Sequence, residues 1–251
     1  MKKKSILLMV ILFGVACTGC SSHNQSKVKT VYGDTYIYKV FSENEAAIGD
    51  LQRGNRVSTY FIPVILDGYR VTQLGYPSGL FFVGNGSFSQ DPSDINVERF
   101  YYPSTIERIN DGYLLYARNS LDVMYCGTVV DIAKLNINGN LSYYVPFQDY
   151  ESYLEIFSGD RNQLKKANVI YDLNYENHEY YYVDYVEETQ KIENIPPSPS
   201  REGYSFEGWY KENTFLQQWD FTTDMVLLEE GVNELRLYAK WKRNGVINEN
   251  N

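Results

Sequence analysis

Short runs in which apolar and polar residues alternate make up much of the chain after residue 35. The first three cover residues 36–40, 45–50 and 57–62, and the turn-forming sequences Ser-Glu-Asn and Gly-Asn lie between them. Alternation with a period of two is typical of half-buried strands, and turn residues at both ends favour strands over helices. The pattern therefore predicts a mostly β, or α+β, protein that begins with three strands.

Similar strand phrases recur further along the chain at regular spacing. Tyr102 and Val123 are 21 residues apart, Val123 and Tyr144 are also 21 residues apart, and Ile62 precedes Tyr102 by 40 residues, close to two periods. A short strand repeated about every 20 residues is typical of a solenoid, in which each unit buries its apolar face against the next. We therefore expect a solenoid after the first strands.

The sequence around these positions resembles a known repeat family. The phrases "IPVILDGYRVTQLG" and "FYYPSTIERIN" contain Pro63 and Pro103, and "YYVPFQDYESYLEIF" contains Pro146. Proline removes a backbone donor from a sheet and turns the chain at a strand end. The first two phrases resemble the BspA-type leucine-rich repeats of bacterial surface proteins, and the third resembles the strand and short helix that close such arrays. This resemblance covers residues 36–158 and implies a short, irregular leucine-rich-repeat solenoid.

The C-terminal part of the chain carries a sharper motif, P-x-x-x-GY-x-F-x-GWY followed by WDF and LYAKW. The motif residues are Gly203, Tyr204, Phe206, Gly208, Trp209, Trp219, Phe221, Leu237, Tyr238 and Trp241. Their order and spacing resemble the Listeria–Bacteroides repeat, also known as the internalin B-repeat. The resemblance covers residues 167–242 and implies a small β-grasp-like domain of mixed strands with one short helix, whose first strands are expected at 168–174 and 180–188.

The N-terminus has the features of an export signal. Three lysines precede an apolar run at residues 5–13, which is shorter than the roughly 20 residues of a membrane span. Small residues and two cysteines follow, and they resemble the lipobox of bacterial lipoproteins. We expect a signal peptide at 1–16 with Cys17 acylated; the alternative is a signal peptide at 1–19 with Cys20 acylated. A diacyl anchor would hold the protein stably on the bacterial cell membrane, facing the envelope or surface.

Three polar segments complete the expected organisation. Residues 17–35 are rich in Ser, Asn, Gln and Lys and are predicted to be the acylated N-terminus and a flexible tether. Residues 159–166 are predicted to link the two domains, and residues 243–251 to form a polar tail. The formal net charge of −9 argues against nucleic acid as a partner, because an acidic surface repels phosphate.

The sequence offers little material for catalysis or for a bound cofactor. The chain has only two His and three Cys, and it contains no phosphate-binding glycine loop, no H-E-x-x-H and no dinucleotide-binding motif. Cys126 lies in an apolar run and is expected to be a small buried residue. The sequence therefore predicts a protein that is not an enzyme, with no catalytic residue, metal or cofactor.

A run of tyrosines in the C-terminal part leaves two interpretations open. On a strand, Tyr180 and Tyr182 share one face. That face either presents aromatic rings to a partner, because tyrosine offers a large rigid contact area, or packs inside the protein as part of a strand that is buried on both sides. Tyr180 and Tyr182 are therefore the candidate recognition residues from the sequence.

Three functional hypotheses remain. The leading one is a lipid-anchored cell-surface protein whose repeats recognise a host or cell-wall protein or glycan. The second is a structural spacer of the cell envelope without a specific ligand. The third, more remote, is a cell-envelope hydrolase, which would need carboxylates that converge in a cleft. A contiguous exposed aromatic surface would distinguish recognition from a spacer.

Overall fold

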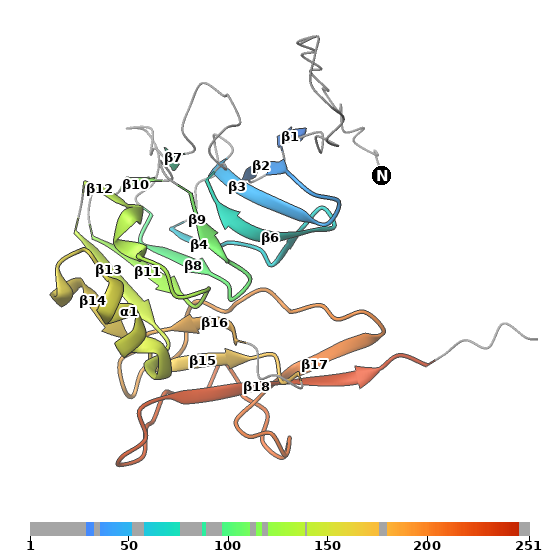
Figure 1. The fold of residues 1–251 in the computed structure, drawn as a ribbon. Coiled ribbons are helices and arrows are strands. Elements are labelled where there is room, and N and C mark those ends of the chain that lie inside the picture. The colour runs from blue at the N-terminus through green and yellow to red at the C-terminus, as the bar shows by residue number, and fades with distance from the viewer. Residues whose placement is uncertain are drawn as a thin grey trace, which may run out of the picture.

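The computed structural model describes residues 29–32, 36–51, 58–75, 87–88, 97–110, 114–116, 120–138, 140–175 and 180–245 (Figure 1). The protein is mostly β, as predicted, and the described strands belong to four sheets. The expected signal peptide and both candidate acylation residues, Cys17 and Cys20, lie outside the described residues. No helix in the described ranges is both long and apolar enough to cross a membrane.

A five-stranded parallel sheet forms the middle of the molecule. Its strands lie in space in the same order as along the chain, each pairing in parallel with the next. They are β4 (Thr59–Phe61), β8 (Arg99–Tyr102), β11 (Leu121–Tyr125), β13 (Leu141–Val145) and β14 (Leu164–Lys166). Successive parallel strands joined by returning chain are the arrangement expected of a solenoid.

The register of this sheet differs from the one that the sequence spacing predicts. Phe100 is aligned with Val123, and Val123 with Tyr143, so the steps are 23 and 20 residues rather than 21 and 21. Because side chains alternate between the faces of a strand, a shift of one residue reverses a side chain's direction. Tyr144 therefore lies on the opposite face from Val123, where equal spacing would have put the two in line.

Two further sheets lie beside the parallel sheet in the N-terminal two thirds. One has the order β1-β2-β3-β6-β5, with β9 also paired to β6, and the other has the order β12-β10-β7. Their strands are β1 (Lys29–Tyr32), β2 (Tyr36–Val40), β3 (Glu45–Leu51), β5 (Ile65–Leu66), β6 (Tyr69–Leu74), β7 (Ser87–Phe88), β9 (Arg108–Ile109), β10 (Leu114–Tyr116) and β12 (Asn136–Asn138). The predicted tether is shorter than expected, because β1 pairs with β2 within it.

The prolines noted in the sequence follow strands of the parallel sheet. Pro103 comes directly after β8 and Pro146 directly after β13, while Pro63 lies two residues beyond the end of β4. After Pro146 the chain enters a 3-10 helix, η2 (Phe147–Asp149), and then α1 (Tyr150–Ile156). Tyr153 fixes α1 to the solenoid, since its ring is buried and its hydroxyl donates to the Gly127 carbonyl at 2.7 Å.

The expected linker at 159–166 is part of the fold. It contains a short 3-10 helix, η3 (Arg161–Gln163), and then β14, which adds to the parallel sheet beside β13. The Asp160 side chain accepts a hydrogen bond from the Asn162 amide and so starts η3. Leu164 is buried in the solenoid core, which explains why this polar stretch is ordered as a strand. Another 3-10 helix, η1 (Ile132–Leu135), precedes β12.

The C-terminal sheet has four strands in the order β16-β15-β18-β17. They are β15 (Val169–Asp172), β16 (Tyr180–Asp184), β17 (Tyr204–Tyr210) and β18 (Leu235–Arg243). The sheet is mixed, because β15 and β18 run parallel while the other two pairs are antiparallel. The short helix that the resemblance implies is absent from the described residues 167–175 and 180–245, where turns and irregular chain join β17 to β18.

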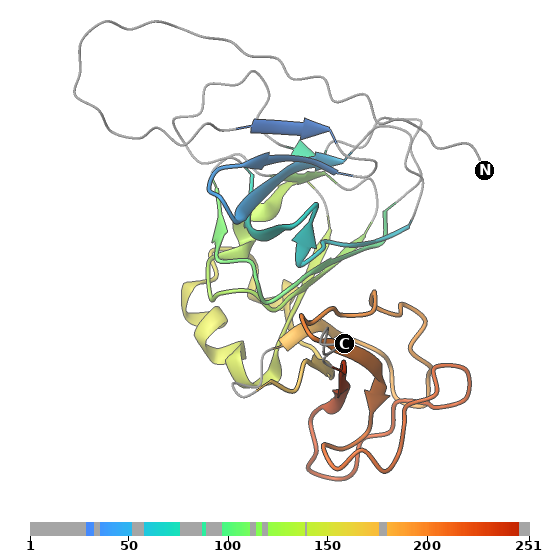
Figure 2. The ribbon, with the colours of Figure 1, turned by 90° about the vertical axis from the view of Figure 1, so that its right-hand side faces the viewer.

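Two apolar clusters account for the core. The first fills the solenoid with the inward-facing side chains of the parallel strands, and its rings contact one another in pairs such as Tyr60 with Phe100 at 5.3 Å. The second joins the outward face of the same parallel strands to the C-terminal sheet. Figures 1 and 2 both show this sheet lying below the parallel sheet.

Candidate recognition surface and the junction between the sheets

The junction between the parallel sheet and the C-terminal sheet is lined with outward-facing side chains of the parallel strands. Tyr101 from β8, Met124 from β11 and Tyr144 from β13 all belong to the cluster that includes the C-terminal sheet, and each is buried. Phe61 from β4 stacks on Tyr101 at 4.1 Å between ring centroids. This face of the solenoid is therefore covered by the protein's own C-terminal part and is not open to a ligand.

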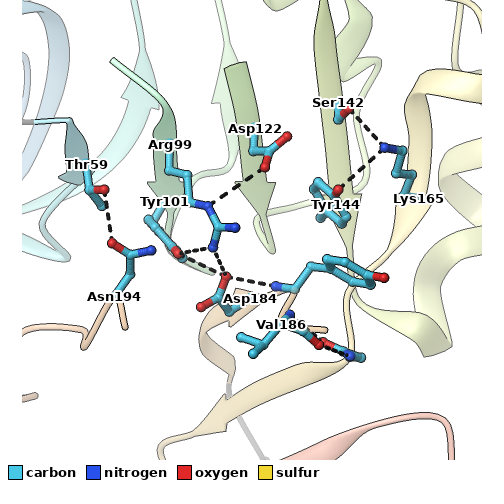
Figure 3. A network of polar contacts seen from close by, with 12 residues as sticks. Thr59, Arg99, Tyr101, Asp122, Ser142, Tyr144, Lys165, Asp184, Val186 and Asn194 are labelled. Carbon is cyan, nitrogen blue, oxygen red and sulfur yellow. Dashed lines mark hydrogen bonds and ion pairs between the residues drawn. The ribbon is translucent and has the colours of Figure 1, made fainter. Parts of the chain in front are cut away.

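A polar network crosses the junction at the end of β16 (Figure 3). Asp184 accepts hydrogen bonds at Oδ1 from the Tyr101 hydroxyl at 2.9 Å, from Arg99 Nη1 at 3.2 Å and from the Tyr185 amide at 2.8 Å. Arg99 Nε also lies 3.8 Å from Asp122 Oδ2. The network thus ties the first residue of β8 and the second residue of β11 to the last residue of β16.

Asp184 is held in an environment that disfavours its charge. Its side chain is buried, and Oδ2 has no hydrogen-bond partner among the described residues. Burial raises the pKa of Asp184 from 3.8 to about 6, although Arg99 and the Tyr101 hydroxyl act in the opposite direction. Desolvation wins because all three donors converge on one oxygen and leave the other without compensation.

The paired carboxylates of this network do not have the setting of a hydrolase site. Arg99 lies between Asp122 and Asp184 and forms an ion pair with each of them (Figure 3). Asp184 is buried within the junction rather than exposed in a cleft, so water and a substrate could not reach it without separating the sheets. The network therefore serves as a structural connection, and this geometry lends no support to the hydrolase hypothesis.

Neighbouring contacts extend the junction on both sides (Figure 3). On one side, the Thr59 hydroxyl donates to Asn194 Oδ1 at 3.0 Å. On the other, the rings of Tyr144 and Tyr185 stack with centroids 5.0 Å apart, and Lys165 Nζ donates to the Ser142 hydroxyl at 3.1 Å. Asn194 belongs to the chain between β16 and β17, so both the strands and the loops of the C-terminal part contact the solenoid.

Of the two tyrosines singled out from the sequence, Tyr182 lies inside this junction and Tyr180 is only half-buried. Tyr182 is completely buried, and its hydroxyl donates to the Ile62 carbonyl at 2.7 Å. Tyr181, on the other face of β16, is also buried. Tyr180 is half-buried, with its hydroxyl 3.4 Å from Gln148 Oε1. The structure therefore corrects the recognition interpretation of Tyr182 and favours the alternative of a strand packed on both sides.

Cys126 is buried at the same junction, as expected. Its Sγ lies 3.4 Å from the Tyr102 carbonyl and 3.7 Å from the Tyr181 carbonyl. Burial raises the pKa of this thiol, which keeps it protonated and unreactive. The thiol thus packs between the solenoid and the edge of β16.

The glycines and several aromatic residues of the C-terminal motif shape the antiparallel pair of β17 and β18, which residues 211–234 connect and which we call the β17–β18 hairpin. Gly203 has φ 76° in the turn before β17, and Gly208 has φ 126° where the pairing with β18 shifts register. Only glycine adopts such angles without strain, and a side chain at Gly208 would also meet Gln218. Five further motif residues are Trp209, Trp219 and Leu237, which are buried, and Phe221 and Tyr238, which are partly buried.

A contiguous, partly exposed aromatic surface lies at the far end of this hairpin. The rings of Phe206 and Trp241 are 5.6 Å apart, and Trp241 also contacts Tyr175 at 5.7 Å. The Arg201 guanidinium lies between two rings, 4.7 Å from Tyr175 and 4.0 Å from Tyr204. All five side chains are partly exposed. We call the set formed by Tyr175, Arg201, Tyr204, Phe206 and Trp241 the aromatic surface.

Backbone pairing explains why the aromatic surface is exposed. β15 pairs with β18 only between Leu235 and Tyr238, whereas β17 pairs with β18 from Tyr238 to Arg243. The last part of the hairpin is consequently two-stranded, and Figure 1 shows it extending past β15 and β16. Trp241 is held in place there by its Nε1, which donates to the Leu173 carbonyl at 2.8 Å.

Three members of the aromatic surface also belong to the C-terminal sequence motif, where they are expected as structural residues. Tyr204, Phe206 and Trp241 follow the period-two pattern of half-buried strands, so they were indistinguishable from ordinary core residues. Tyr175 and Arg201 lie outside the regular strands, and no sequence pattern brings them together with the hairpin. Among the described residues, no group of His, Cys, Asp and Glu has the arrangement of a metal site.

Comparison with known proteins places the C-terminal part in a family context. Residues 168–240 match the model of the Listeria-Bacteroides repeat domain. A Gly-rich membrane protein of Evansella cellulosilytica is 41% identical over 49 residues, which are 20% of this chain and 5% of that protein. Internalin H of Listeria monocytogenes is 41% identical over 49 residues, 20% of this chain and 8% of its own length. A second membrane protein of Evansella cellulosilytica is 37% identical over 49 residues, 20% of this chain and 7% of its length.

These relatives are far longer than the segment they share. The chain spans less than a tenth of the length of each, so the similarity concerns one repeat and not whole proteins. The match agrees with the motif in the sequence and links this part of the chain to repeats that occur in membrane and surface proteins.

Proposed function

We propose that this protein is a non-catalytic, lipid-anchored protein of the bacterial cell surface that binds a host or cell-wall ligand through the aromatic surface. One observation carries the proposal: four partly exposed rings and an arginine, drawn from β17, β18 and two loops, are in continuous contact at one end of the molecule. Contiguous apolar patches that reach the surface mark interaction sites, and tyrosine and tryptophan are the side chains that such sites favour.

The five-stranded parallel sheet supports the proposal that this is a repeat protein of the cell surface. Its short strands at steps of 20 to 23 residues fit the leucine-rich-repeat assignment that the resemblance of residues 36–158 implies. Because its outward face is covered, the solenoid acts as a rigid base for the C-terminal sheet. In the spacer hypothesis the same base exists, but the aromatic surface would have no ligand.

A binding screen of the full chain, purified in detergent, tests recognition against the spacer hypothesis. We expect binding to at least one class among matrix proteins, mucins and glycans, and at least a tenfold loss of affinity in the double variant Tyr175→Ala, Tyr204→Ala, because both rings belong to the aromatic surface. Tyr69→Ala, a half-buried tyrosine of β6, is the matched control and should bind normally. Absence of binding to every class, in protein shown to be folded by circular dichroism, would favour the spacer.

Lipidation is tested separately by mass spectrometry of the mature N-terminus. We expect a diacylglycerol thioether on Cys17 and its complete loss in Cys17→Ala, with the protein then released from the membrane fraction, because anchoring needs the acyl chains. Cys20→Ala should remain anchored. The reverse pattern would assign the anchor to Cys20, and an unmodified N-terminus in both variants and the native protein would refute the anchor altogether.

A further inference from the structure

The basic residues of the C-terminal part fall into two groups. Those of the first group form ion pairs: Lys211 with Asp224, Arg236 with Asp172 and Glu234, and Lys240 with Glu207. The second group forms none with the residues that the structure describes: Lys191 on the loop before β17, and Arg201, Lys242 and Arg243 at the end of the β17–β18 hairpin that carries the aromatic surface. Three of the four basic residues without an ion pair among the described residues are therefore gathered there, although acidic residues outnumber basic ones in this part of the chain.

Strand pairing puts one of these residues on the same face as the aromatic rings. In the antiparallel pair β17–β18, Tyr204 is directly opposite Arg243, and Phe206 is opposite Trp241. Residues that are directly opposite each other point to the same side of a sheet. Arg243, which is exposed, thus borders the rings at one end, while Arg201 lies between Tyr175 and Tyr204.

Among the described residues, no carboxylate pairs with the Arg201 guanidinium, which contacts the rings of Tyr175 and Tyr204. A guanidinium lying over an aromatic ring is held by its face, so the N–H donors at its edge remain free for an acceptor. Arginine binds planar anionic groups such as carboxylates and sulfates through paired hydrogen bonds. The ring faces beside it suit a second kind of contact, with the weakly positive C–H groups of a saturated ring.

We propose, on the basis of the function proposed above, that the aromatic surface binds an anionic glycan. Sugar rings of the glycan stack on Tyr204, Phe206 and Trp241, and acidic groups of the glycan pair with Arg201 and Arg243. A glycan fits because it combines stackable C–H faces with spaced negative charges in one extended polymer. An anionic membrane fits less well, since a broad negative surface would meet the acidic residues around the hairpin, including the exposed Glu202.

Direct binding of the full chain to defined polymers tests the ligand class. The anionic sugars are hyaluronan, which carries carboxylates, and heparin, which adds sulfates; dextran is the neutral sugar, and poly-γ-glutamate is an anionic polymer without sugar rings. We expect binding to at least one of the two anionic glycans that weakens as salt is raised, and at least tenfold weaker binding to both dextran and poly-γ-glutamate. Preference between hyaluronan and heparin identifies the acidic group.

Charge reversal at the two arginines locates the site. Arg201→Glu and Arg243→Glu should each weaken glycan binding, and the two combined should weaken it at least tenfold. Lys191→Glu, which reverses one charge at an exposed lysine on the loop before β17 as each single variant does, should leave it unchanged. The Tyr204→Ala variant should also weaken glycan binding, although it keeps both arginines. Unfolding curves check that each variant is folded.

The outcomes distinguish this inference from the function on which it rests. Binding of proteins or mucin peptides in the screen, with no binding of either anionic glycan, would overturn the ligand class and leave recognition standing. Equal binding of poly-γ-glutamate, or equal loss in Lys191→Glu, would also overturn it by reducing the interaction to non-specific charge. If the protein binds none of the ligands in either experiment, both proposals are wrong.

Discussion

Replacement of Tyr182 by alanine is expected to lower the free energy of unfolding by about 3–5 kcal/mol, as for other large aromatic residues removed from a core. Tyr182 is completely buried between the solenoid and the C-terminal sheet, where its ring contacts Phe61 at 5.2 Å and Tyr181 at 4.4 Å. Its removal leaves a cavity in the junction and an unpaired carbonyl at Ile62. Chemical denaturation of the purified chain measures the loss.

The variant Tyr182→Phe separates the two contributions. It keeps the ring and removes only the hydroxyl that donates to Ile62, so the expected loss is about 1 kcal/mol. Tyr180→Ala serves as the comparison on the same strand and, because Tyr180 is half-buried, should cost less than Tyr182→Ala. Equal losses at the two positions would contradict a junction centred on Tyr182.

A large effect at Tyr182 would also show that the two parts of the chain unfold together. The junction joins residues of β4, β8, β11 and β13 to β16 in one apolar cluster. Damage at such a shared core destabilises both sides, whereas two independent domains would show one unfolding transition shifted and the other unchanged. Monitoring the tryptophans, which all lie in the C-terminal part, beside circular dichroism would compare the transitions.

Local sequence patterns predicted the strands and the mostly β class. They did not predict the junction, because it joins residues that are far apart in the sequence. The ranges 36–40 and 45–50 became β2 and β3 almost unchanged, because alternation and turn residues are local signals. Tyr101, Met124 and Tyr144 alternate with inward-facing residues in the same way that solvent-facing residues would. Only the folded chain shows that these outward positions are apolar because a second sheet covers them.

The same limit applies to β16 and to the aromatic surface. A strand with rings on both faces fits either an exposed recognition strand or a strand packed between two layers, and Tyr181 and Tyr182 prove to be packed. Conversely, Phe206 and Trp241 belong to the periodic motif of a small core, yet they lie on the two-stranded end of the hairpin, where coverage stops. Their partial exposure follows from their place at the end of the β17–β18 pair, which strand pairing sets and the identity of neither residue reveals.

The buried carboxylate of Asp184 makes stability depend on pH in a direction opposite to that of most acidic residues. Its pKa is raised from 3.8 to about 6 in the folded protein, chiefly by burial. Between these values the folded chain holds a proton that the unfolded chain releases, so this group's contribution to stability falls as pH rises from about 4 to about 6. A shift of about two units corresponds to roughly 3 kcal/mol as an order of magnitude.

The variant Asp184→Asn isolates this contribution. Asparagine keeps an oxygen that accepts from Tyr101 and from the Tyr185 amide, but it does not titrate. We subtract the free energy of unfolding of Asp184→Asn from that of the unsubstituted protein. This difference should fall by about 1–3 kcal/mol between pH 4.5 and pH 7.5, because only the unsubstituted protein has a carboxylate that becomes charged at this position. Denaturation at several pH values measures this difference, from which the other carboxylates cancel.

Arg99 decides how much of that pH dependence survives in the native protein. Its guanidinium lies 3.2 Å from Asp184 and 3.8 Å from Asp122, so it already stabilises negative charge at the junction. Replacing it in Arg99→Met leaves Asp184 buried without a cation, which raises the pKa of Asp184 further and should shift the pH-dependent loss of stability to higher pH. Arg161→Met, the same change at an exposed arginine of η3, is the control and should leave the pH of this loss where it is in the native protein. A profile identical in the native chain and in Asp184→Asn would mean that burial does not hold the proton on Asp184, and that Arg99 alone sets the charge of the junction.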